Sequence, residues 1–117
     1  MDTILLDAIE YNGGGINALL NKGIVKSVQR GSTKIDLVIN TDGGAERRSQ
    51  SIPINPIDTK KSLLIIYSEN QQNNKDVSGS TKTITLSDSS ITFSLDAPQY
   101  YTEWKASPLL WQVVEFY

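Results

Sequence analysis

The sequence predicts a mainly β protein, a small antiparallel β-sandwich of about seven strands preceded by a short N-terminal helical segment. Three observations predict this fold. From Gly23 onward, apolar and polar residues alternate in short runs, as they do in strands with one buried face. Turn-forming residues separate these runs at short intervals. The chain has 117 residues, which suits a single domain with one core.

The N-terminal residues differ from the rest, so we divide the chain into an anchor segment, 1–22, and a sandwich domain, 23–117. Residues 3–11 have the spacing of an amphipathic helix that ends at a run of glycines. A second helical turn is predicted within 16–22. The apolar face of the first helix consists of Ile4, Leu5, Ala8 and Ile9. Because so short a helix is marginal in water, we expect it to lie on the sheet or on a neighbouring subunit.

Four strands are predicted in the first part of the sandwich domain, at 24–30, 34–40, 47–55 and 62–68. A turn at Gly31-Ser32 separates the first two, and Asp42-Gly43 is a hairpin signal before the third. Pro53 predicts an edge position for the third strand, because proline cannot donate to the ladder. The fourth is a continuous apolar run, which predicts a central strand buried on both faces.

The second part is predicted to hold an exposed loop at 69–80, a hairpin of strands 81–87 and 90–96, a loop at 97–108 and a terminal strand at 109–117. Alternation in the terminal strand places Trp111 and Val113 on one face, and Val114 and Phe116 on the other. Both faces are apolar, so we expect the sandwich core to cover one side and the N-terminal helix or another subunit to cover the other. The predicted oligomer contacts are Ile4, Leu5, Ala8, Ile9, Trp111 and Val113.

The composition argues against catalysis. The chain has no Cys and no His, which removes disulfides, thiolate catalysis, thiolate zinc sites and the commonest general base. Glu103 and Glu115 are the candidate pair for glycoside hydrolysis, but a small sandwich leaves little room for a deep cleft. No loop has the carboxylate spacing of a calcium site. We therefore expect no enzyme activity, no metal site and no cofactor.

The charge pattern argues against two kinds of partner. The net charge is −2, and the basic pairs Arg47-Arg48 and Lys60-Lys61 are isolated, whereas nucleic-acid surfaces need clustered cations. Acidic residues interrupt the short apolar runs at the N-terminus, which therefore predict neither a signal peptide nor a membrane span. We expect neither nucleic-acid binding nor membrane insertion.

One stretch of the chain has the composition of a carbohydrate site. The predicted loop contains Tyr100, Tyr101, Glu103 and Trp104. Aromatic faces stack on the apolar faces of sugars, and polar neighbours fix the orientation of the ligand by hydrogen bonds. The alternative is that these rings close the end of the core or a subunit interface.

Four phrases in this chain resemble small bacteriophage virion proteins usually labelled tail, tail-fibre or structural. They are "KGIVKSVQRGS" at 22–32, "INPIDTKKSLLIIYS" at 54–68, "ITFSL" at 91–95 and "WQVVEFY" at 111–117. Their order and spacing together carry the resemblance, which covers residues 22–117. The arrangement is also similar, at the level of fold, to H-type lectin sandwiches, which form trimers.

The resemblance implies a virion protein with an all-β body that acts through assembly. We expect a homotrimer on the tail or another outer surface of the particle, with other virion proteins and host surface glycans as partners. The alternatives are a capsid decoration or head-fibre protein, which would grip the shell through its N-terminal segment, and a free-standing carbohydrate-binding lectin.

Overall fold

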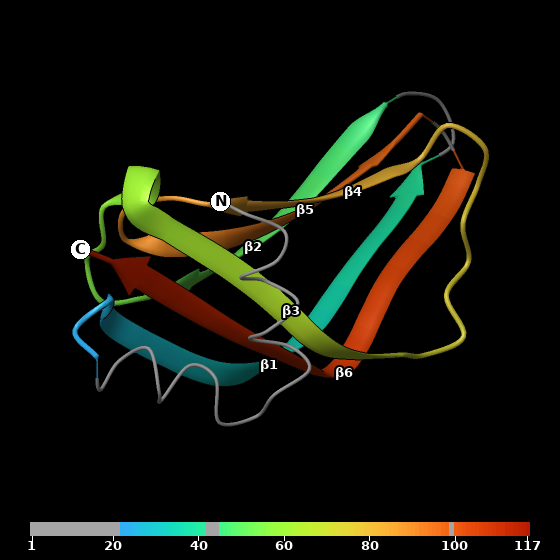
Figure 1. Cartoon of the computed structure of the whole chain (residues 1–117). Helices are drawn as coiled ribbons and strands as arrows, with labels where there is room; N and C mark the ends of the chain where they lie inside the picture. Colours follow the sequence, from blue (N-terminus) through green and yellow to red (C-terminus); the bar gives the residue numbers. More distant parts are fainter. Residues whose placement is uncertain (1–21, 42–44, 99) are drawn as a thin grey trace.

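The computed structural model describes residues 22–41, 45–98 and 100–117. These residues form two three-stranded antiparallel sheets that face each other: sheet A, with the order β1-β6-β3, and sheet B, with the order β2-β5-β4 (Figure 1). The elements are β1 (Val25–Thr41), β2 (Glu46–Pro53), the 3-10 helix η1 (Thr59–Lys61), β3 (Ser62–Gln71), β4 (Thr81–Leu86), β5 (Ser90–Ala97) and β6 (Tyr100–Phe116). The predicted all-β sandwich is confirmed. The predicted N-terminal helix falls outside the described residues.

β1 is a single strand of 17 residues where the sequence predicts two, at 24–30 and 34–40. Its ladder with β6 continues through Gly31 and Ser32, so the predicted turn there is wrong. The glycine serves packing instead. The indole of Trp111 lies so close to it that a Cβ atom would be 2.7 Å from Cε2 of the ring. This merger reduces the predicted seven strands to six.

β6 is longer than the predicted terminal strand, because it already begins at Tyr100. The loop predicted at 97–108 is therefore wrong for most of its length. The register with β1 shifts at Ser107-Pro108, a bulge at which the missing N–H of proline costs no ladder hydrogen bond. The bulge switches which residues face the core. The core-facing residues are Thr102, Trp104 and Ala106 before it, and Leu109, Trp111 and Val113 after it.

The order of the strands confirms the interior position predicted for the chain's last strand. β6 lies between β1 and β3, and its residues Val113 and Val114, on opposite faces, are 1% and 0% exposed. The central position predicted for 62–68 is wrong, because β3 is an edge strand. β2 is an edge strand that ends at Pro53, and β4 pairs with β5 as the predicted hairpin.

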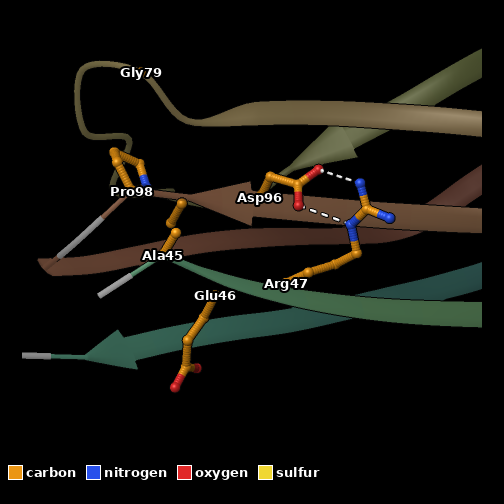
Figure 2. Close-up of a pocket in the computed structure, with 7 residues that line it drawn as sticks. Ala45, Glu46, Arg47, Gly79, Asp96 and Pro98 are labelled. Carbon is orange, nitrogen blue, oxygen red and sulfur yellow. Dashed lines mark hydrogen bonds and ion pairs between the residues drawn. The ribbon is translucent and has the colours of Figure 1, made fainter. Parts of the chain in front are cut away.

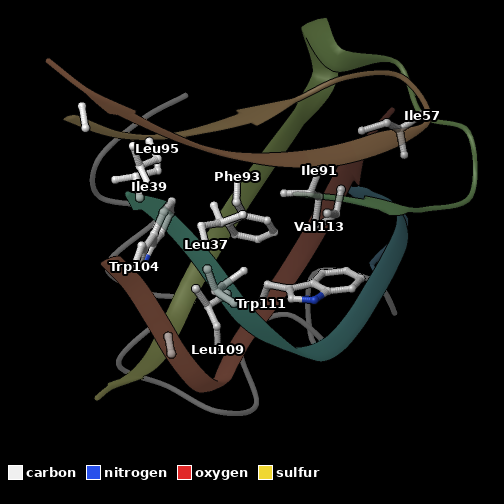
Figure 3. Packing of buried hydrophobic residues seen from close by; sticks show 13 residues of the cluster. Leu37, Ile39, Ile57, Ile91, Phe93, Leu95, Trp104, Leu109, Trp111 and Val113 are labelled. Atoms are coloured by element: carbon white, nitrogen blue, oxygen red, sulfur yellow. The ribbon is translucent and has the colours of Figure 1, made fainter. Parts of the chain in front are cut away.

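The main core fills the space between the two sheets and is built around three aromatic rings (Figure 3). Phe93 of β5 packs edge-on against Trp104 of β6, with 5.9 Å between ring centroids and 71° between the planes. Trp111 lies toward the other end of the core, beyond Phe93 in this view. Large aromatic side chains contribute much of the buried area of a domain this small.

Two glutamine side chains connect the sheets where β1 lies next to the segment that contains β2. The Gln29 carboxamide accepts from Asn55 N at 2.7 Å and donates to Asn55 O at 3.0 Å. The Gln50 carboxamide donates to Lys34 O at 2.7 Å. Each side chain thus bonds to backbone as a neighbouring strand would, and satisfies polar groups at the open edge of a sheet.

The segment 72–80, which connects β3 to β4, is bound to the first half of β6. Asn74 accepts from Lys105 N at 2.7 Å and donates to Lys105 O at 3.2 Å. The carbonyl of Lys75 accepts from Glu103 N at 2.9 Å. The predicted exposed loop therefore has mostly exposed side chains, but its backbone is held against the sheet.

We predict that Gly31→Ala lowers the free energy of unfolding by about 1–3 kcal/mol, because the new methyl group displaces the Trp111 ring from a packed core. Urea unfolding followed by tryptophan fluorescence measures the change. Ser32→Ala is the matched control, since this neighbouring side chain is exposed. An equal effect of both substitutions, or no effect of the first, would contradict the packing role of Gly31.

Candidate functional site

The structure separates the four predicted ligand-binding residues. Tyr100 begins β6, and its side chain is not among those described. Tyr101 and Glu103 are partly exposed, whereas Trp104 is 2% exposed and lies in the core. The indole Nε1 of Trp104 donates to Glu69 Oε1 at 2.8 Å. A ligand role for Trp104 is therefore wrong, because the alternation of β6 turns its ring inward.

Three residues, Tyr101, Glu103 and Lys105, alternate with the buried residues of β6 and point outward; we call them the β6 strip. Lys105 Nζ lies 3.7 Å from Glu103 Oε2, and Lys75 Nζ lies 5.6 Å from the centroid of the Tyr101 ring. A hydrogen bond to the Glu103 carboxylate raises the pKa of Tyr101, and desolvation and nearby negative charge add to the effect. The phenol therefore stays protonated at neutral pH.

The β6 strip is fixed in place by the segment 72–80. Between two strip residues, the side chain of Thr102 is fully buried, and its hydroxyl donates to Lys75 O at 2.8 Å. Together with the bonds of Asn74, this contact joins the loop to the strand on which the strip stands. A surface held by two packed elements loses little conformational entropy when it binds a ligand.

A pocket of about 370 Å³ lies at the end of β5, just before the chain enters β6 (Figure 2). Its lining residues are Ala45, Glu46, Arg47, Gly79, Asp96, Ala97 and Pro98. Across it, Arg47 Nε donates to Asp96 Oδ1 at 2.7 Å and Nη2 donates to Oδ2 at 3.2 Å. This two-point hydrogen bond lowers the pKa of Asp96 and raises the pKa of Arg47.

Sequence reasoning missed this pair because it treats Arg47 as a solvated loop charge. Arg47 and Asp96 are 49 positions apart, and they meet only because β2 and β5 pair in the register Arg47↔Asp96. No local pattern in the sequence indicates that register. A hairpin signal joins neighbouring strands, whereas β2 and β5 are separated by β3 and β4 along the chain.

The two carboxylates considered for glycoside hydrolysis are not brought together. Glu103 belongs to the β6 strip, while Glu115 lies near the other end of β6, 5% exposed. The Glu115 carboxylate accepts from Asp58 N at 2.8 Å and from Ser27 Oγ at 3.3 Å. It therefore ties the turn before β3 to β6 and β1, which is a structural role.

The groups at this end of the molecule suit binding of a polar ligand. The β6 strip and the pocket offer a phenol, carboxylates, an ammonium and a guanidinium, which are donors and acceptors for hydroxylated ligands. Within the described ranges, no group of three or more acidic residues is placed to hold a metal ion. No helix in that part of the chain is long and apolar enough to cross a membrane.

Two of the predicted oligomer contacts lie in the core, as Trp104 does. Trp111 and Val113 face sheet B and are 8% and 1% exposed, so they are core residues and offer no surface to a partner. Their prediction as contacts is wrong. Alternation separates the two faces of β6, but it does not say which face is turned to the core. Ile4, Leu5, Ala8 and Ile9 lie outside the described residues.

Comparison with known proteins finds no relative of this chain. No family model, no curated protein and no solved structure matches it.

We predict that Arg47→Gln raises the pKa of Asp96 toward its ordinary value, because the hydrogen bonds and the positive charge that lower it are removed. Carboxyl ¹³C NMR titration measures this pKa. In the wild type, the folded-state pKa of Asp96 is below the unfolded value. Its contribution to stability is therefore present above the unfolded pKa and lost as the pH falls through the folded pKa.

Arg48→Gln is the control for this prediction, since Arg48 pairs with Glu46 at 2.7 Å rather than with Asp96. Acidification should destabilise the wild type and Arg48→Gln through this pair, but not Arg47→Gln. An Asp96 pKa that stays low in Arg47→Gln would show that the guanidinium is not the cause.

Proposed function

We propose that this protein is a structural component of a bacteriophage particle. It forms a homotrimeric module on the tail or another outer surface, docks on the particle and contacts host surface glycans. A capsid decoration or head-fibre protein is the alternative position for such a module. The resemblance of residues 22–117 to small phage virion proteins is the basis of the proposal, and residues 1–22 would be the attachment segment.

The observation that supports the proposal most is that three of the four matched phrases are neighbours in space. The phrase 22–32 includes the first half of β1, 54–68 includes η1 and most of β3, and 111–117 includes the end of β6. These parts of β1, β6 and β3 lie side by side in sheet A (Figure 1). Gln29 bonds to Asn55, and Glu115 bonds to the turn before η1. The phrases thus describe one packed unit.

The fourth phrase, 91–95, lies in the central strand of sheet B and supplies Phe93 to the core. All four phrases therefore belong to the scaffold of the sandwich. The β6 strip and the residues that line the pocket lie outside all four phrases, although Asp96 directly follows the fourth. This division suits a protein family that keeps a common docking body and varies the end that meets a ligand.

We predict that the protein is present in purified phage particles in a fixed copy number that is a multiple of three. Mass spectrometry of gradient-purified particles measures the copy number, and antibody labelling in negative-stain images measures the position. Label on the tail supports the tail-associated form, and label on the shell supports the decoration form. Absence from purified particles would reject the proposal in both forms.

A second candidate, a free-standing lectin, is favoured by the β6 strip. Tyr101 presents a ring with the ammonium of Lys75 over one face, and Glu103 and Lys105 supply hydrogen-bonding groups on the same strand. Aromatic and polar groups in this combination bind sugars by stacking and by oriented hydrogen bonds. A lectin of this kind would bind glycans without any particle.

We predict that Tyr101→Ala abolishes binding on a glycan array, because the stacking surface is lost, while the protein remains folded. The control is Tyr117→Ala, which removes an exposed ring, 70% accessible, at the opposite end of β6. Circular dichroism confirms the fold of each variant. Absence of binding by the wild type, or equal binding by both variants, would contradict the assignment of the strip as a glycan site.

A further inference from the structure

A second apolar cluster lies on the outer face of sheet A, away from sheet B. Its buried members are Val25 of β1, Ile65 of β3 and Val114 of β6, at 1%, 3% and 0% exposure. Partly buried residues of the same strands surround them: Val28, Leu63 and Phe116. The cluster therefore spans all three strands of the sheet.

An apolar cluster of this kind on the outer face of a sheet is stable only when it is covered. β1 and β3 are edge strands, so no further strand shields Val25 or Ile65 from the side. A face turned away from the core is covered only by whatever lies on top of it. All six residues of the cluster come from sheet A itself, so no other described element contributes an apolar residue to it.

The other described segments are occupied elsewhere. The turn 54–61 packs at the end of the core, where Ile57 belongs to the main cluster. The segment 72–80 is bound to the first half of β6, beyond the Ser107-Pro108 bulge from Val114. A covering layer on this face must therefore come from outside these segments.

Sheet B provides the contrast. Its outward positions are Arg47, Ser49, Ser51, Thr81, Thr83, Thr85, Thr92, Ser94 and Asp96. Hydroxyl pairs such as Ser49 Oγ with Ser94 Oγ at 3.0 Å satisfy this face without apolar contact. Among the described residues, an apolar cluster is therefore found on the outer face of sheet A and not on that of sheet B.

We propose that residues 1–21 of the same chain bind the outer face of sheet A, with the apolar side of residues 3–11 on the cluster around Val114. The described chain begins at Lys22, three positions before Val25, so residues 1–21 are joined to the chain at the edge of this face. A helix of residues 3–11 is about 14 Å long, which crosses three strands spaced about 4.8 Å apart. The connecting residues 12–21 reach about 33 Å when extended.

The charges of the two surfaces are complementary. The segment carries Asp2, Asp7 and Glu10 beside its apolar residues, and the exposed residues Lys26 and Arg30 lie along β1 at the border of the cluster. Opposite charges at the rim orient the helix, while burial of its apolar side supplies the binding free energy. The proposal goes beyond the proposed function and holds whether or not the protein is a phage component.

Paramagnetic relaxation measured by NMR tests the proposal, because the chain has no native cysteine to compete for a spin label. A nitroxide on Asp7→Cys, at the polar side of the segment, should remove most of the amide signal intensity of Val25, Ile65 and Val114. Amides of sheet B such as Thr83 should keep theirs. A label on Thr83→Cys is the matched control and should give the reverse pattern.

Two further samples make the result decisive. Adding Leu5→Asp to the labelled chain should restore the signals of the cluster, whereas Asp2→Asn, a change outside the apolar side, should not. A mixture of ¹⁵N-labelled chain without nitroxide and unlabelled chain with nitroxide should show no loss of signal. Loss in that mixture would assign the face to the segment of a second copy, and no loss in any sample would assign it to another partner; either result overturns the proposal.

Discussion

The structure depends on β6 lying between β1 and β3. Its 17 residues supply one side of both ladders in sheet A, so without β6 the two outer strands have no partner in the sheet. The same strand places Trp104 and Trp111 in the core between the sheets, and Val114 on the opposite face. β6 thus provides the backbone hydrogen bonds of both its neighbours and buries side chains on both of its faces. The rest of the sandwich is therefore organised around β6.

The bulge at Ser107-Pro108 divides β6 into two halves with different surroundings. The second half carries the matched phrase 111–117, the buried carboxylate of Glu115 and the outer cluster. The first half carries the β6 strip and is bound by the segment 72–80. One strand thus joins a packed scaffold to a polar end that carries the β6 strip. Loop-bound ends on a rigid scaffold are where specificity usually resides.

Alternation of apolar and polar residues was sufficient to predict the sandwich, the β4–β5 hairpin and the interior position of the last strand. It failed where a residue type that usually ends a strand serves another purpose. Gly31 makes room for the Trp111 ring, and Pro108 sits at a bulge, so both strands continue where the sequence predicts breaks. Alternation also cannot assign Trp104 to the core or to the surface. The bulge at Ser107-Pro108 changes which alternate residues face the core, and the sequence does not predict that bulge. The Arg47–Asp96 pair depends on strand register, which local sequence does not encode.

The outer faces of the two sheets differ in polarity. Sheet B presents Ser and Thr hydroxyls that bond to each other, as Ser51 does with Thr92 at 2.8 Å, and such a face is stable in water. Sheet A presents an apolar cluster that is stable only when covered. The β6 strip lies on this same outer face, on the other side of the Ser107-Pro108 bulge, so the face of sheet A has a polar half and an apolar half.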